Sequence, residues 1–84
     1  MKRYLVLAMR KPSFDEAVIA PHAAFLDGLR AAGKLEMTGG FSDSTGGAYL
    51  LNVASLAEAQ AIVDADPLAT MGSSTITVHE WNTR

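Results

Sequence analysis

Apolar and polar positions along this chain group into short runs, and their spacing predicts four strands and two main helices. Runs rich in Leu, Val and Tyr, or alternating in polarity, predict strands over residues 3–9, 35–41, 48–53 and 73–81. Apolar residues three and four positions apart predict a helix that ends near Ala32 and a second one that opens at Ser55. The second helix is expected to turn one face inward, formed by Leu56, Ala59, Ile62 and Val63.

Local motifs indicate where the helices begin and end. Residues 13–16 and 55–58 both match a capping box, a Ser followed three positions later by Glu. Pro21 has no N–H to donate, so either the first turn is irregular or the main helix begins near Pro21. Gly33 is expected to terminate this helix in a left-handed conformation. The Asp66-Pro67 step predicts a further short turn, with Asp66 as its cap.

The order of the elements, β-α-β-β-α-β, predicts an α+β fold of the ferredoxin-like type in a single domain, residues 1–84. Four antiparallel strands would carry both helices on one face. The first strand is apolar on both sides, with Leu5, Leu7 and Met9 opposite Tyr4, Val6 and Ala8. The helices can cover only one face, so we expect the other face to pack in a homodimer.

Length and cysteine content support the expectation of a partner. A chain of 84 residues buries only about 60% of its unfolded surface. A folded monomer is therefore expected to be only marginally stable unless a disulfide, a metal or a partner stabilises it. The sequence contains no cysteine and two distant histidines, which excludes a disulfide or thiolate zinc site and disfavours other structural metals. Association with another copy is the remaining common way to stabilise so small a domain.

Charge and hydropathy narrow the class of protein. The net charge is −2, from seven Lys and Arg against nine Asp and Glu, with no sustained basic stripe, so binding of nucleic acid is disfavoured. The apolar run after Met1 is too short for a signal peptide. No segment approaches the roughly 20 apolar residues that span a membrane. We expect a cytoplasmic protein without a membrane anchor.

The most informative residue for chemistry is a histidine on an apolar helix face. His22, Phe25, Leu26 and Leu29 are spaced at i, i+3, i+4 and i+7 and share one face, so the imidazole should point inward. If the fold brings Asp66 beside it, the pair would form an oriented imidazole in a partly dry pocket. Such an arrangement suits proton transfer.

Each of these two residues also has a purely structural interpretation. His22 could be a core histidine whose ring nitrogens bind backbone groups. Asp66 could be only an N-cap for the short turn, although one oxygen could cap while the other faces His22. Tyr49 and Trp81 are interpreted as packing or dimer-contact residues.

In this order, several motifs resemble the YciI-like (YCII-related) family of the dimeric α+β barrel superfamily. They are Tyr4-Leu5-Val6-Leu7, His22-x-x-Phe25-Leu26-x-x-Leu29-x-x-x-Gly33, Gly39-Gly40-Phe41, Ser55-x-x-Glu58-Ala59, Asp66-Pro67 and Val78-x-x-Trp81. The resemblance implies a small dimer whose pocket holds a His and an Asp, here His22 and Asp66. Related members perform cofactor-free steps on aromatic or lactone-like molecules, including dehydrochlorination. The family often has Gly-Pro where this chain has Gly39-Gly40.

Two functions of different classes therefore follow. The first is a cofactor-independent enzyme for elimination, dehydrochlorination or isomerisation of a small organic substrate, without a metal, with His22 as acid or base and Asp66 orienting it. Phe25, Phe41 and Met71 are expected to contact the substrate and exclude water. The alternative is a non-catalytic small-molecule-binding or accessory dimer, or a dimer with a purely structural role, because no nucleophile or oxyanion hole is evident.

Overall fold

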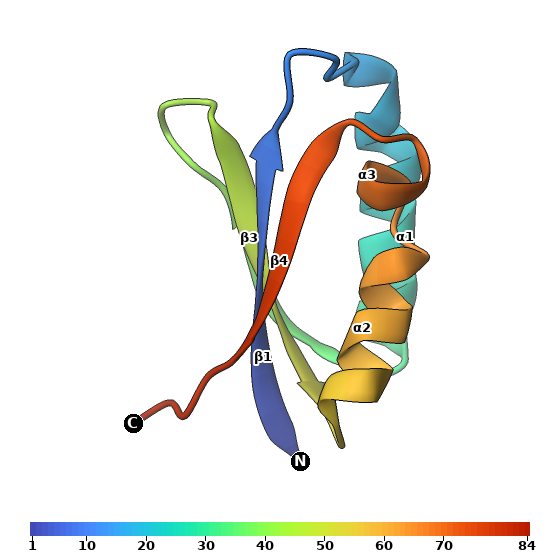
Figure 1. Cartoon of the computed structure of the whole chain (residues 1–84). Helices are drawn as coiled ribbons and strands as arrows, with labels where there is room; N and C mark the ends of the chain where they lie inside the picture. Colours follow the sequence, from blue (N-terminus) through green and yellow to red (C-terminus); the bar gives the residue numbers. More distant parts are fainter.

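Four antiparallel strands form one sheet in the order β2-β3-β1-β4, and all the helices lie against one of its faces (Figure 1). The computed structural model describes all residues, 1–84. The elements are β1 (Lys2–Arg10), the 3-10 turn η1 (Glu16–Val18), α1 (Ile19–Ala31), β2 (Leu35–Gly40), β3 (Gly46–Val53), α2 (Leu56–Asp64), α3 (Pro67–Thr70) and β4 (Ser74–Glu80). This confirms the predicted α+β fold with the ferredoxin-like strand order. None of the helices combines the length and apolar character needed to cross a membrane.

The core lies between the sheet and the helices. The central strand β1 pairs with β3 on one side and β4 on the other, so that Tyr4 lies between Leu51 and Glu80. Every second side chain of these strands faces the helices. The main core includes Tyr4, Val6, Leu26, Leu51, Val53 and Val63, all buried.

The start of the first helix differs from the predicted capping box. Asp15, not Ser13, is the cap, and its carboxylate accepts the N–H of Ala17 at 2.9 Å. A 3-10 turn follows. The sequence allowed either an irregular first turn or a helix that begins near Pro21, and the structure has the irregular turn. Pro21 then lies in the first turn of α1, where backbone N–H groups have no partner within the helix. Gly33 adopts a φ of 75° and ends the helix as expected.

The second helix begins as predicted, with the Ser55 hydroxyl accepting the N–H of Glu58 at 3.2 Å. Its inward face is shorter than predicted. Ala59 and Val63 are buried, whereas Leu56 is 53% exposed. Helical side chains lean toward the N-terminus, so the side chain of this first helical residue projects past the end of the helix instead of onto the core.

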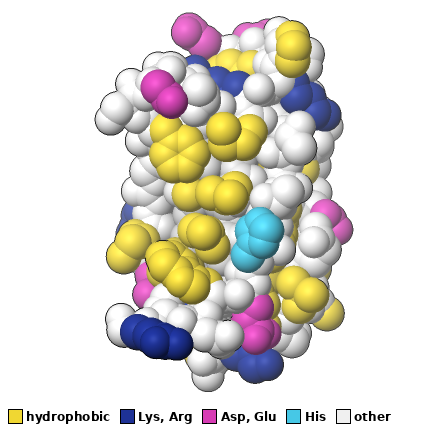
Figure 2. All heavy atoms as spheres, turned by 60° about the vertical axis from the view of Figure 1, so that its left-hand side comes forward, with side chains coloured by type: hydrophobic (Ala, Val, Ile, Leu, Met, Phe, Trp, Pro, Cys, Tyr) yellow, Lys and Arg dark blue, Asp and Glu magenta, His cyan; other side chains and the backbone are white.

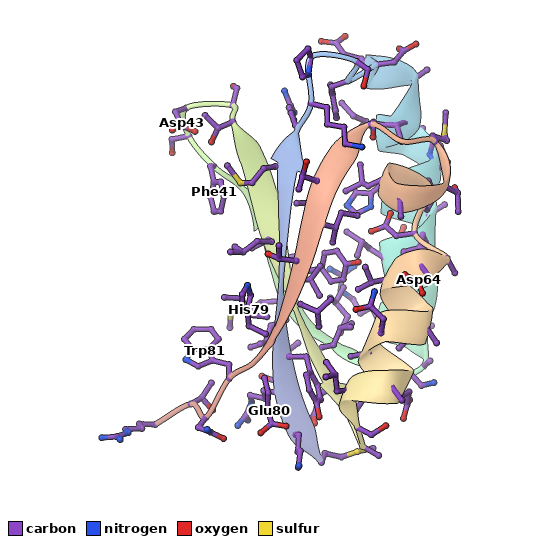
Figure 3. The ribbon with its side chains drawn as sticks, in the orientation of Figure 1. Phe41, Asp43, Asp64, His79, Glu80 and Trp81 are labelled. Carbon is purple, nitrogen blue, oxygen red and sulfur yellow. The ribbon has the colours of Figure 1, made fainter.

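The face of the sheet opposite the helices is apolar and uncovered. Figure 2 shows hydrophobic side chains gathered across it, with a histidine among them and charged residues toward the upper and lower ends. Figure 3 shows Phe41, His79 and Trp81 projecting from the side of the sheet away from the helices. By strand register this open face also carries Leu5, Leu7, Met9, Met37 and Leu50.

Candidate active site

The candidate site is built around His22, which α1 holds over the helix side of the sheet. Its side chain is 19% exposed, and its ring atom Nδ1 lies 2.8 Å from Oδ1 of Asp66. Phe25, Leu26 and Leu29 are buried or half-buried on the same helix face, in agreement with the spacing of these residues. Asp66 lies where α2 ends and α3 begins, 44 positions further along the chain. The fold thus brings the two side chains into direct contact.

Asp66 is fully buried and accepts three hydrogen bonds. Its Oδ1 accepts from His22 and from the backbone N–H of Leu68 at 2.9 Å, and its Oδ2 accepts from the Tyr49 hydroxyl at 2.8 Å. One oxygen therefore both caps α3 and contacts the imidazole, whereas the two tasks were expected to fall on different oxygens. Three donors suit an ionised carboxylate, which can only accept. They offset the cost of burying its charge.

Tyr49, on β3, is the third member of this group and was not predicted. Its ring centroid lies 6.0 Å from that of His22. Burial raises the pKa of the Tyr49 phenol well above its usual range, and the charge of Asp66 and the hydrogen bond to it act in the same direction. The phenol therefore stays protonated and donates to Asp66. A core-facing tyrosine needs a buried partner for its hydroxyl, and this need was the available signal in the sequence.

These contacts define the state of the imidazole. Nδ1 faces a carboxylate oxygen, so it carries a hydrogen and donates. In the neutral ring Nε2 then holds the free lone pair, and it makes no hydrogen bond within the protein. His22 also lines a cavity between α1 and the sheet. The arrangement can accept a proton from a bound molecule at Nε2, or return one.

The cavity beside His22 has a volume of about 290 Å³. An apolar cavity of about 150 Å³ accommodates benzene, so this one has room for an aromatic ring with substituents. Phe14, Ile19, Leu26 and Leu68 provide apolar walls. Gly40 and Gly47 also line the cavity; a Cβ on Gly47 would come within 2.5 Å of the Gly39 carbonyl oxygen, so close strand approach requires glycine there.

The structure does not bring the three residues predicted to bind substrate to this cavity. Phe25 packs against the main core, one helical turn after His22. Phe41 is 41% exposed and borders a separate hollow on the open face, and Met71, which ends α3, is 55% exposed. The apolar part of the cavity wall is formed instead by Phe14, Ile19, Leu26 and Leu68.

The second histidine has different surroundings. His79 lies on the open face, with Nε2 3.1 Å from the Thr77 hydroxyl and no carboxylate partner. No group of three or more His, Cys, Asp or Glu side chains is arranged to hold a metal ion. His22 is thus distinguished from His79 by its carboxylate and by its cavity.

Comparison with known proteins identifies the family of this chain. A family model for the YCII-related domain matches residues 2–82. The chain belongs to this family. It is 49% identical over 81 residues to the uncharacterized protein YjpA of Bacillus subtilis (strain 168), covering 96% of this chain and 95% of that protein. The family resemblance noted in the sequence is thereby confirmed.

The fold of this chain is similar to that of a solved enzyme structure. That enzyme is the 5-chloro-2-hydroxyhydroquinone dehydrochlorinase TftG from Burkholderia phenoliruptrix AC1100, in complex with 2,5-dihydroxybenzoquinone. The two chains superpose with a TM-score of 0.75 at 22% identity, over 98% of this chain and 95% of that one. At this level of identity the match shows a common fold.

The three-donor arrangement predicts that Asp66→Asn destabilises the protein. The amide retains one accepting oxygen and turns an NH2 group toward buried donors, so we expect a loss of about 1–3 kcal/mol in the free energy of unfolding. Urea unfolding at neutral pH measures it. The control is Asp64→Asn, because exposed Asp64 accepts only from Gln60 on its own helix and should change stability by less than about 0.5 kcal/mol. Equal losses in both variants would contradict the assignment.

The raised pKa of Tyr49 predicts an alkaline loss of stability. An unfolded tyrosine ionises near pH 10, whereas folded Tyr49 keeps its proton to higher pH. Its contribution is therefore complete below about pH 10 and falls above it by up to about 1.4 kcal/mol per pH unit. Urea unfolding of the wild type and of Tyr49→Phe between about pH 9 and 12 measures the difference. The wild type and the variant both contain Tyr4, so any effect of that residue cancels in the comparison. Parallel pH profiles of the two proteins would therefore refute the role of Tyr49.

Proposed function

We propose that this protein is a small cofactor-independent enzyme in which His22 transfers a proton at Nε2. The observation that carries the proposal is the contact of Nδ1 with a fully buried carboxylate, while the same ring lines a cavity of ligand size. Asp66 is a positioning residue that fixes the ring orientation. Its charge stabilises the imidazolium formed when Nε2 takes a proton. Tyr49 in turn holds Asp66.

The chemistry that fits is proton abstraction from carbon. Nε2 takes a proton from a C–H bond, and the electron pair left on carbon forms a double bond. In elimination, a leaving group such as chloride departs with its own electron pair from the neighbouring carbon. In isomerisation, the imidazolium returns the proton to a different carbon. Both routes need one acid–base group and a partly dry cavity.

The character of the cavity supports a small, partly apolar organic substrate. Its walls are largely apolar, and its volume of about 290 Å³ suits a substituted ring. TftG, which shares the fold, is named a dehydrochlorinase and was solved with a quinone. That likeness supports elimination as one of the two routes.

A second candidate function is ligand binding without turnover. Only one imidazole lines the cavity, no carboxyl side chain does, and the Tyr49 hydroxyl is already occupied by Asp66, so no second acid–base pair stands beside His22. The same His–Asp pair would then serve recognition. Product formation or isotope exchange distinguishes the two functions.

Proton transfer is tested by incubating the protein with a metabolite extract in D2O and analysing the mixture by mass spectrometry. We expect a compound that gains deuterium or is converted to a product, at a rate that falls at least about 100-fold in His22→Gln. The matched control is His79→Gln, which replaces the other histidine and should retain the activity. Activity that survives in His22→Gln would contradict the enzymatic proposal. A ligand that stabilises the protein but stays unlabelled and chemically unchanged would favour binding without turnover.

We also propose that two copies associate through the open face. Its apolar side chains come from β1, β2 and β3 and from Trp81, which follows β4, and the hollow there is lined by Leu5, Met37, Leu50 and Trp81. Leaving such a surface in water forfeits roughly 25 cal/mol for each Å² of apolar area that a partner would cover. A second chain presents the same surface, so the contact is self-complementary.

Dimer formation is tested by light scattering on the wild type and on Met37→Glu. Met37 is 62% exposed, so the charge should spare the folded monomer but be buried in the dimer. For the wild type we expect twice the chain mass of 8.9 kDa. For the variant we expect a dimer dissociation constant at least about tenfold higher. Leu56→Glu is the control, since Leu56 is similarly exposed but lies on a helix. A monomeric wild type would overturn the proposal.

A further inference from the structure

A second polar group lines the cavity apart from His22 and Asp66. Arg10, the last residue of β1, and Ser74, the first residue of β4, are direct cross-strand partners. Both line the cavity. They lie on the helix side of the sheet, because Arg10 has the same parity along β1 as the buried Tyr4, Val6 and Ala8. The cavity therefore carries a guanidinium and a hydroxyl side by side.

The Ser74 hydroxyl has no partner within the protein. The residue is only 7% exposed, yet its Oγ makes no hydrogen bond, whereas the hydroxyl of the neighbouring Ser73 donates to the Leu68 carbonyl. No fully buried side-chain nitrogen or oxygen lacks a hydrogen-bond partner, so this Oγ is not sealed inside the protein but is accessible from the cavity that the residue lines. The hydroxyl is therefore free to bond to a molecule in the cavity. Its position in the cavity wall makes a bound molecule the natural partner.

Arg10 is also without an ionic partner. Four of the seven Lys and Arg residues lie within 3.5 Å of a carboxylate oxygen: Lys2, Arg3, Arg30 and Lys34. The guanidinium of Arg10 instead lies over the Phe14 ring, 4.2 Å from its centroid. A cation–π contact holds the group in place without using its N–H donors. Of the cations without an ion pair, only Arg10 lines the cavity.

We propose that Arg10 and Ser74 bind the carboxylate of an anionic substrate whose carbon skeleton extends along the cavity to His22. This rests on the proposed function, which places the substrate in this cavity. A guanidinium offers two parallel N–H donors that match a carboxylate, and the Ser74 hydroxyl adds a third. A single cation among apolar walls suits a monoanion better than a phosphate dianion. The substrate class is thus a small organic acid with an apolar, ring-sized body.

The test measures binding of benzoate to the intact protein by NMR, with benzamide as the uncharged probe of the same shape. We expect benzoate to shift the His22 ring signals and to bind at least about tenfold more tightly than benzamide. Arg10→Gln should weaken benzoate binding by about tenfold and leave benzamide unchanged. Ser74→Ala should weaken benzoate by about threefold, since one neutral donor is lost.

The matched control is Lys11→Gln, which removes the same charge from the adjacent residue that does not line the cavity. It should change the benzoate dissociation constant by less than about twofold. Equal affinity of benzoate and benzamide, equal effects of Arg10→Gln and Lys11→Gln, or no benzoate binding at tens of millimolar would each overturn the proposal. Benzoate binding does not depend on turnover, so these results are independent of the isotope-exchange test of His22.

Discussion

The burial of one carboxylate is the constraint on which this site depends. Asp66 has no contact with water, and an ionised carboxylate in such a place is stable only when donors surround it. The donors come from α1, β3 and the first turn of α3, three segments far apart in the sequence. The carboxylate is satisfied only when helix, strand and turn have all assembled. The contacts that orient the imidazole are therefore part of the tertiary fold.

One side chain thus has a structural and a chemical role. As the cap of α3, Asp66 sets where the chain turns toward β4, and the same oxygen holds the imidazole of His22. The cap places the carboxylate, and the carboxylate selects the ring nitrogen that remains free. The choice between a structural and a functional interpretation of Asp66 is for this reason not exclusive. Whether His22 reacts is decided by what enters the cavity, not by the geometry of the pair.

The parts of this structure that follow a local rule could be predicted from the sequence. The strands, the left-handed Gly33 and the Asp66-Pro67 turn each depend on residues close together along the chain, and the helix spacing correctly turned His22 inward. The cavity wall could not be predicted, because it depends on how α1, the segment before it and the sheet pack against one another in three dimensions. Phe25 is one turn from His22, yet it packs into the closed core, whereas Phe14 precedes the helix and reaches the cavity. Tyr49 was overlooked for a related reason: its partner is distant in the sequence.

The strip formed by β2 and β3 separates the cavity beside His22 from the hollow on the open face. Thr38, Gly40 and Tyr49 border both the cavity beside His22 and the hollow on the open face. Gly39 and Ala48 border both as well, so part of the barrier is glycine backbone and part is the side chains of Thr38, Ala48 and Tyr49. A second chain over the open face would remove water from the back of this strip and lower the local dielectric around the Tyr49–Asp66 hydrogen bond, which strengthens it. On the two proposals made above, self-association would act on the site through β3, although no residue of a partner needs to enter the cavity.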